Sequence, residues 1–257
     1  MSLRFDHAVV VVDALPQAVA AFTAAGFTVS PGGRHDGIPT ENALVPFADG
    51  AYLELLAFRE RSARAELRAL RDGPRWDAHV KSVSAIGRRF LPRLAGPDGV
   101  ADAVVGRDGL ARFAVESRAR GFVSTGPVAM RRERSGAGTL EWELLLPAEE
   151  AIPFAIEDRT PRAWRVPGSP EATRHPNAAT GVAAVELGAR DPAALALRLA
   201  DLFEARLASR DGRTCATFAG LPWWIVAAET DGARGVRIAG VQALPAAIEA
   251  LGVRGEA

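Results

Sequence analysis

Two titratable side chains of this sequence lie within apolar segments of strand length. His7 precedes the β-branched run Val9–Val12, and Glu54 lies between leucines in the segment Tyr52–Phe58. An imidazole and a carboxylate that face a pocket can ligate a divalent metal or transfer a proton. Each also has a simpler interpretation, because a strand histidine is often a hydrogen-bonded core residue and a strand glutamate often faces solvent. Which interpretation holds depends on the elements that position the two side chains.

The first sixty residues predict the element order βαβββ. Asp13 and Pro16 provide a helix cap and a proline suited to the first turn, and Gly26 is the expected end of that helix. Asp49-Gly50 is a strong hairpin signal. The predicted elements are a strand at Val9–Val12, a helix from Leu15 to Gly26, a strand at Phe27–Ser30, and a hairpin of Asn42–Phe47 with Ala51–Phe58.

The same unit recurs later in the chain at an offset of 95 residues, which indicates an internal duplication. Asp102 thereby aligns with His7. In the second hairpin the offset shifts, and the predicted closing strand 140–145 aligns Glu143 with Glu54. The pairs that carry the alignment are Asp13 with Asp108, Leu15 with Leu110, Gly26 with Gly121, and Phe27 with Phe122.

Composition and helix and strand signals suggest how the rest of the chain is organised. Arg59–Leu94 is charged and helix-prone, while Val182–Leu187 predicts a strand followed by a helix from Asp191, as in the first two copies. We therefore expect a first βαβββ module over 1–58, a helical excursion over 59–98, a second module over 99–158, a connector over 159–177 rich in Pro, Arg and Ser, and a third, diverged βαβββ-like module over 178–257.

Charge and cysteine content exclude several classes of function. The 31 Lys and Arg balance the 31 Asp and Glu, so no net field attracts nucleic acid or an anionic membrane. Cys215 is the only cysteine, which excludes an intramolecular disulfide and a cysteine-based zinc site and favours a cytoplasmic location. The sequence contains no export signal, no transmembrane segment, and none of the Gly-x-Ser-x-Gly, phosphate-loop, His-Glu-x-x-His or Cys-x-x-Cys signatures.

Several segments resemble glyoxalase-like members of the vicinal oxygen chelate superfamily. They are Phe5–Val12, Gly32–His35, Thr40–Leu44, Tyr52–Leu55 and, before the third module, His175–Asn177. The resemblance implies an α+β fold in which two βαβββ modules form one open barrel around a shared cavity. The third module would cover or extend that barrel.

The resemblance also implies a metal site, because the superfamily commonly holds a divalent metal on the first and last strands of each module. The implied ligands are His7, Glu54, Asp102 and Glu143, a set suited to Zn²⁺, Ni²⁺, Mn²⁺ or Fe²⁺, with no organic cofactor. Asp102 departs from the pattern, since His or Gln is usual there and Asp is shorter. The metal would polarise two neighbouring substrate oxygens, and Glu54 or Glu143 would be the catalytic base.

Five polar residues near strand ends are candidate contacts for a small-molecule ligand, although turn chemistry accounts for each of them too. They are His35, Thr40, Asn42, His175 and Asn177. The expected function is that of a lyase, isomerase or dioxygenase relative acting on a small oxygenated metabolite. Two alternatives remain: a metal-free binding or sequestering protein similar to bleomycin-resistance proteins, and a structural module with a filled cavity. A homodimer is also expected from the architecture, unless the third module replaces the partner.

Overall fold

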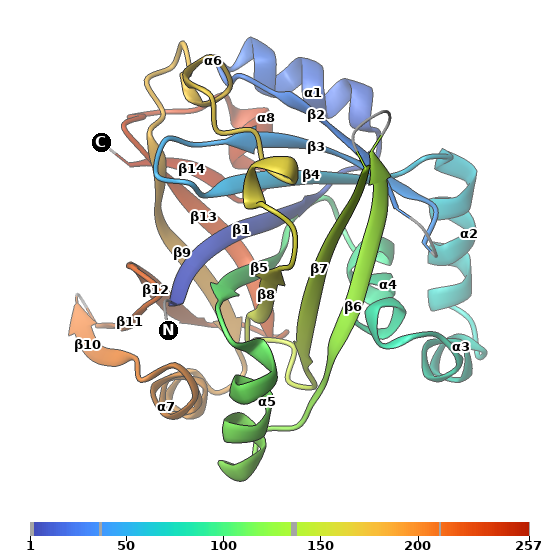
Figure 1. The fold of residues 1–257 in the computed structure, drawn as a ribbon, viewed down its shortest axis with the longest axis vertical. Helices are drawn as coiled ribbons and strands as arrows, with labels where there is room; N and C mark the ends of the chain where they lie inside the picture. Colours follow the sequence, from blue (N-terminus) through green and yellow to red (C-terminus); the bar gives the residue numbers. More distant parts are fainter. Residues whose placement is uncertain (1–2, 36–37, 135–137, 211, 257) are drawn as a thin grey trace.

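The computed structural model describes residues 3–35, 38–134, 138–210 and 212–256, which form two β-sheets with surrounding helices (Figure 1). The larger sheet has eight strands in the order β2-β3-β4-β1-β5-β8-β7-β6. Its first half contains β1 (Leu3–Val11), α1 (Leu15–Ala24), β2 (Ser30–Arg34), β3 (Thr40–Pro46) and β4 (Tyr52–Phe58). Its second half contains β5 (Gly99–Arg107), α5 (Leu110–Ala119), β6 (Ser124–Arg134), β7 (Gly138–Pro147) and β8 (Phe154–Asp158).

The strands of the second half follow the order of the first half in reverse across the sheet, so that β5, β8, β7 and β6 correspond to β1, β4, β3 and β2. In each half the first strand pairs in parallel with the last, and β1 pairs antiparallel with β5 to join the halves. Gly26 and Gly121 follow α1 and α5 with φ of +84° and +83°, a left-handed conformation that glycine adopts without strain. The predicted fold class, paired βαβββ modules in an open barrel, is confirmed.

The predicted closing strand of the second module is wrong by one strand. Residues 140–145 lie in β7, which pairs with β6 and β8 and therefore corresponds to β3. The counterpart of β4 is β8, because β8 pairs in parallel with β5. The register of these pairs aligns Phe154, rather than Glu143, with Glu54. The error arises because residues 124–134 form one long strand with a bulge, β6, so residues 140–145 belong to the third strand of the module and not to the fourth.

Between the two halves the chain forms three helices, α2 (Arg61–Arg71), α3 (Trp76–Ser82) and α4 (Ala85–Ala95), as the charged segment predicted. The Ser84 side chain caps α4 by accepting a hydrogen bond from the Gly87 amide. Leu91 and Leu94 of α4 pack with Val9 and Val11 of β1 in one apolar cluster. Helix α4 therefore occupies part of the open barrel, beside β7 (Figure 1).

The smaller sheet has six strands in the order β10-β11-β12-β9-β13-β14. It contains β9 (Gly181–Ala189), α7 (Pro192–Phe203), β10 (Arg206–Arg210), β11 (Arg213–Phe218), β12 (Leu221–Ala227), β13 (Gly232–Ala239), α8 (Ala246–Glu249) and β14 (Val253–Glu256). Strands β9 to β12 repeat the pairing of the first module, while β13 and β14 pair as β5 and β8 do. The C-terminal region thus holds a third module and, in the described residues, only the first and last strands of a fourth.

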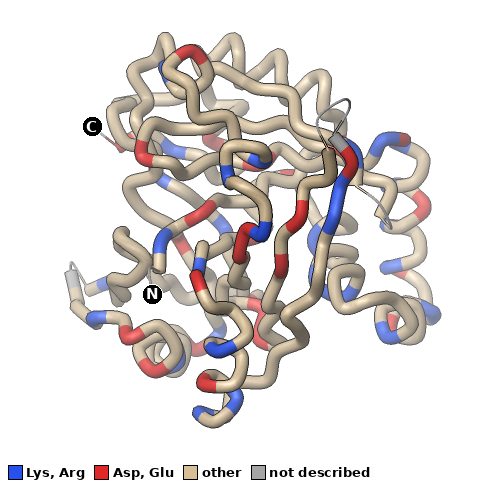
Figure 2. Tube along the Cα trace, viewed as in Figure 1, with Lys and Arg blue, Asp and Glu red and all other residues tan. Residues whose placement is uncertain are grey.

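A single core joins the two sheets. The Phe5 and Trp223 rings meet edge to face at 5.8 Å, and Phe218 stacks on Trp223 at 4.5 Å. The Phe5 amide also donates to the Ala219 carbonyl at 2.8 Å. Figure 2 shows charges of both signs interspersed over most of the trace, whereas α1 carries none. Among the described residues, no helix is long and apolar enough to span a membrane.

Candidate functional site

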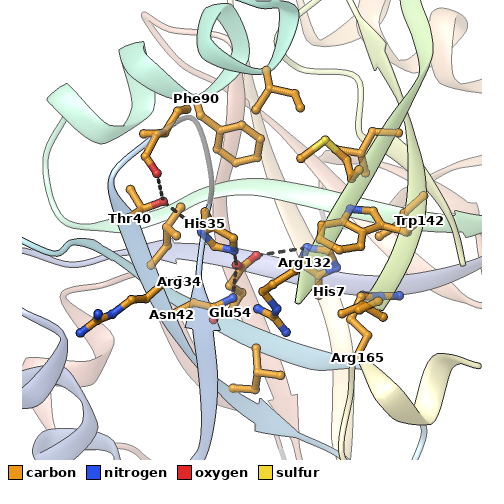
Figure 3. Close-up of a pocket in the computed structure, with 18 of the residues that line it drawn as sticks. His7, Arg34, His35, Thr40, Asn42, Glu54, Phe90, Arg132, Trp142 and Arg165 are labelled. Atoms are coloured by element: carbon orange, nitrogen blue, oxygen red, sulfur yellow. Dashed lines mark hydrogen bonds and ion pairs between the residues drawn. The ribbon is translucent and has the colours of Figure 1, made fainter. Parts of the chain in front are cut away.

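A cavity of about 150 Å³ opens inside the eight-stranded sheet (Figure 3). Its polar side comes mainly from the first module, through His7 on β1, Asn42 on β3 and Glu54 on β4. Its opposite side is apolar and comes from α4 and the second module. The apolar lining includes Phe90, Met130, Trp142, Leu144, Phe154 and Ile156. The cavity therefore has one hydrogen-bonding end and one wall suited to an apolar body.

Glu54 is the centre of the polar end. The Asn42 amide donates to Glu54 Oε1 at 2.6 Å, His35 Nε2 lies 3.8 Å from the same oxygen, and His7 Nε2 lies 3.5 Å from Oε2. Only 14% of the Glu54 side chain is exposed. A nearly buried carboxylate needs such partners, because desolvation without them is costly.

His7 is held on both of its sides. Its Nδ1 lies 2.8 Å from Oδ1 of Asp6, and its ring stacks on Tyr52 at 4.4 Å with an interplanar angle of 18°. Adjacent strand residues normally point to opposite faces, but a register shift of β1 between Phe5 and His7 permits this contact. Asp6 fixes the orientation of the imidazole, so Nε2 faces Glu54.

Asp6 is in turn bound by two arginines of the connector 159–177. Arg165 Nη1 donates to Asp6 Oδ1 at 3.0 Å and to the Tyr52 hydroxyl at 2.6 Å, and Arg162 donates to Asp6 Oδ2. Arg162 lies in the short helix η1 (Arg162–Trp164). Arg165 also donates to Asp158 at 2.6 Å. The carboxylates of Asp6, Glu54 and Asp158 therefore face the cations of protonated His7, Arg162 and Arg165. Arg4 also lies 3.9 Å from Asp6.

This arrangement shifts the ionisation of the pair that faces the cavity. Burial alone would raise the pKa of Glu54, but the hydrogen bond and charge of His7, the charge of His35 and the Asn42 amide lower it to about 2. Burial alone would lower the pKa of His7, but hydrogen bonds to Asp6 and Glu54 and their charges raise it above 6.5. Glu54 is thus ionised at neutral pH, and the protonated form of His7 is favoured.

The second half of the sheet does not supply the predicted metal ligands. Asp102 is buried, but Arg89 and Arg93 of α4 bind its Oδ2 at 2.8 and 3.0 Å. Burial alone would raise the pKa of Asp102, but these two charges lower it. Phe154 occupies the position that corresponds to Glu54. A divalent ion would have to replace two guanidinium groups at one position and would meet an apolar ring at the other.

Glu143 lies outside the cavity lining, at 2.6 Å from Arg159. Within the described ranges, no group of three or more His, Cys, Asp and Glu side chains is arranged as a metal site. Of the predicted ligands, the fold thus brings only His7 and Glu54 together. The donor set does not fit the metal centre that the family resemblance implied.

The predicted ligand contacts divide into two groups. His35, Thr40 and Asn42 line the cavity, with His35 Nδ1 at 3.0 Å from the Thr40 hydroxyl and the Gly33 amide donating to Asn42 Oδ1 at 2.7 Å. His175 and Asn177 lie outside it. His175 accepts from the Thr28 amide at 2.9 Å and donates to the Pro46 carbonyl at 3.0 Å.

Asn177 donates to the Ala25 carbonyl at 2.9 Å and accepts from the Ala179 amide at 3.1 Å. The bond to Ala25 connects the end of the connector to the end of α1, and the bond of His175 to Pro46 connects it to β3. Burial lowers the pKa of His175, which favours the neutral ring that such bonding requires. The placement of both residues supports a structural role.

The sequence did not identify Asp6, Tyr52 and Arg165 as site residues. Asp6 and Tyr52 contact the His7 ring directly, and Arg165 binds both of them. Asp6 stands beside His7 in the printed sequence, and that adjacency was an available signal. Arg165 carried none, because arginines are abundant and the contact joins β1 to a connector 159 residues away. The sequence likewise did not indicate that Trp142 and Phe90 line the cavity, because apolar residues of a cavity wall have the same sequence pattern as core residues.

Comparison with known proteins agrees with this architecture. A sequence model of the glyoxalase-like domain matches residues 5–203, while no curated protein matches the chain. The crystal structure of a hypothetical protein from Staphylococcus aureus is similar over 99% of both chains, with 16% identity and a TM-score of 0.73. A mutant of 4-hydroxymandelate synthase from Streptomyces coelicolor is similar over 93% of this chain and 71% of its own, with 9% identity and a TM-score of 0.53.

At these identities the solved structures show the fold alone, and the matched domain carries the assignment. The match of the glyoxalase-like domain over residues 5–203 establishes that this chain belongs to the glyoxalase-like domain family.

Proposed function

We propose that this protein binds a small oxygenated organic molecule inside its eight-stranded sheet, and that binding requires no metal. The observation that carries the proposal is the cavity itself, in which the His7–Glu54 pair faces an apolar wall. A volume of about 150 Å³ accommodates roughly one six-membered ring. The proposal is the metal-free alternative that the sequence left open.

The polar end can recognise oxygen atoms of two kinds. Ionised Glu54 accepts a hydrogen bond from a ligand hydroxyl, while the Nε2–H of protonated His7, which already lies 3.5 Å from Glu54, would be shared with a carbonyl or ether oxygen of the ligand. The apolar wall around Trp142 and Phe90 would bury the rest of the molecule. A ligand with one oxygenated end and one apolar body satisfies both parts of the cavity.

The ionisation of the pair supports binding more than proton abstraction. An efficient catalytic base has a pKa near the working pH, whereas the pKa of Glu54 is about 2. As long as its contact with His7 persists, Glu54 is a weak base.

One observation supports a second candidate, a metal-independent isomerase or lyase. Asp6 holds Nδ1 of His7, and the raised pKa of His7 keeps a proton available on the ring near neutral pH. His7 would then be the catalytic acid that protonates a carbonyl or leaving-group oxygen of the bound molecule. Turnover of a bound ligand, abolished in His7→Gln, would establish this candidate.

Binding can be tested with chelator-treated protein. Calorimetric titration with ring-sized probes, cyclohexanone and phenol beside methylcyclohexane and toluene, should show tighter binding of the oxygenated member of each pair. Glu54→Ala should lose the preference for phenol, while the matched variant Glu143→Ala should retain it, since Glu143 lies outside the cavity lining. Binding that appears only after Zn²⁺, Ni²⁺, Mn²⁺ or Fe²⁺ is added would contradict the proposal.

A further inference from the structure

We infer that the ligand is a small cyclic amide, whose carbonyl accepts a hydrogen bond from His7 while its adjacent N–H donates one to Glu54. This inference rests on the proposed function, because it concerns the same cavity, and it names the class of oxygenated molecule that the cavity takes. A single planar amide group uses both side chains at once, whereas a ketone uses one of them.

Glu54 supplies the acceptor of this pair. It is the only carboxylate among the described residues that line the cavity. Its Oε1 accepts from the Asn42 amide at 2.6 Å and lies 3.8 Å from His35, whereas the polar contact of its Oε2 is His7 Nε2 at 3.5 Å. A charge-assisted N–H···O bond is ordinarily about 2.7–2.9 Å long, and a carboxylate oxygen has two lone pairs. Oε2 therefore retains the capacity to accept from a ligand.

His7 supplies the donor beside it. Its Nδ1 lies 2.8 Å from Asp6 and its Nε2 faces Glu54, so the imidazole stands between two carboxylates and donates from both nitrogens. The bond to Asp6 has an ordinary length, while the longer contact with Glu54 holds the Nε2 proton loosely. A ligand carbonyl next to Oε2 can share that proton. Figure 3 shows the Glu54 carboxylate between the His35 and His7 side chains.

Neighbouring side chains hold this donor and acceptor in fixed orientations. The Asn42 amide holds the carboxylate, its own oxygen accepts from the Gly33 amide, and the Tyr52 ring stacks on His7 at 4.4 Å. The amide group of a lactam presents the complementary acceptor and donor on neighbouring atoms in one plane, and it binds without losing a rotatable bond. A hydroxyl beside a ketone carries the same two functions, but the two groups bond to each other and that bond must break before binding.

The other polar side chains at the cavity do not require a donor from the ligand. Arg34, Arg131 and Arg132 border the cavity from the edge strands β2 and β6, and guanidinium groups only donate. The Thr40 hydroxyl lies 3.0 Å from His35 Nδ1. Exchange of the ligand N–H for an oxygen atom therefore reports on the carboxylate of the pair.

Lactams and lactones of equal ring size provide the test, since they differ in that one group. Calorimetric titration of the chelator-treated native protein at pH 7 should show 2-piperidone binding about tenfold more tightly than δ-valerolactone or N-methyl-2-piperidone. The hydroxy ketone 2-hydroxycyclohexanone should also bind less tightly than 2-piperidone. Tighter binding of the hydroxy ketone would overturn the assignment of an amide.

Glu54→Gln should reverse the preference. The Asn42 amide donates to Oε1, so the new side chain keeps its oxygen there and its NH₂ group replaces Oε2. Two donors would then face the ligand, and δ-valerolactone, which offers two acceptor oxygens, should bind at least as tightly as 2-piperidone. The matched variant Glu143→Gln should keep the native preference, since Glu143 lies outside the cavity lining.

Three outcomes would contradict these expectations. Equal binding of the lactam and the lactone by the native protein would overturn this inference, whatever the behaviour of the variants, and would leave the proposed function intact. A lactam preference that persists in Glu54→Gln would overturn it as well, because Glu54 would then not accept the N–H. Failure of the native protein to bind these rings and the neutral probes above would overturn the proposed function together with this inference.

Discussion

Glu54 and His7 stabilise each other's charged forms, and this mutual effect has a definite pH dependence. The pKa of Glu54 is lowered from 4.5 to about 2, so its stabilising contribution is complete above pH 4.5 and is lost as the pH falls toward 2. The pKa of His7 is raised from 6.5, so its contribution is complete below pH 6.5 and is lost as the pH rises through the folded-state value. Both contributions are complete only between pH 4.5 and 6.5.

Glu54→Gln should therefore reduce the free energy of unfolding most within this interval. The expected loss is on the order of 3 kcal/mol, given the shift of Glu54 from 4.5 to about 2, and it should shrink toward pH 2 and above neutral pH. Urea unfolding from pH 3 to 9 measures it. Glu143→Gln is the control, because its ion pair with Arg159 is partly exposed and should contribute less than about 1 kcal/mol. An equal loss at every pH would contradict the coupling.

At the scale of elements, the position at which the resemblance implied a metal ligand instead anchors a helix. Asp102 on β5 binds Arg89 and Arg93, and these two residues tie α4 to the sheet. This contact places Phe90 and Ile86 of α4 at the cavity. Helix α4 therefore occupies the carboxylate of Asp102, which was a predicted metal ligand, and supplies part of the apolar wall.

Asp102→Asn should destabilise the protein by about 3–5 kcal/mol, because it leaves two buried guanidinium groups without their counter-ion. Chemical denaturation gives the value. Glu116→Gln removes an exposed pair with Arg112 on α5 and should change stability by about 0.5 kcal/mol or less. If both variants unfold at the same denaturant concentration, Asp102 does not anchor α4.

The connector makes a second prediction at this scale. Asn177→Ala removes the bonds to Ala25 and Ala179 and should cost about 1–2 kcal/mol. Ligand affinity should stay within about twofold of the native value, because Asn177 does not line the cavity. A large loss of affinity in a folded Asn177→Ala protein would restore this residue as a ligand contact.

At the scale of the whole molecule, the third module is part of the structure that supports the site. The outer side of β1, which carries His7 on its cavity side, packs through Phe5 and Ala8 into the core shared with Trp223 and Ile225 of β12. Residues 178–257 therefore stabilise the strand that positions the candidate site.

The protein should accordingly unfold in one transition. Far-ultraviolet circular dichroism, fluorescence of a variant with Trp142 as its sole tryptophan and fluorescence of one with Trp223 alone should give coincident denaturation curves. A chain ending at residue 177 should not unfold cooperatively, since it exposes the shared core. Two separated transitions would show that the sheets fold independently.

Much of this fold could be predicted from local signals. The β-branched run of β1, the proline and glycine at the ends of α1, and the repeat of these features 95 residues later lie close together along the chain and reflect backbone preferences. The third and fourth strands of the second module were confused, because β7 and β4 have similar alternating patterns and only pairing distinguishes them.

The sequence by itself therefore predicted the modules and identified His7, Glu54, His35, Thr40 and Asn42 as candidates, while a core, solvent or turn role stayed open for each of them. The tertiary structure decided that these side chains line the cavity. Only the tertiary structure decided the partners. In the folded protein Asp102 pairs with two arginines of α4, Glu143 pairs with Arg159, and Asp6 pairs with Arg165 of a connector distant in the sequence. The physical reason is that a charge in a low-dielectric interior is stabilised by whichever counter-charge the fold brings near, and that proximity is not encoded in local spacing.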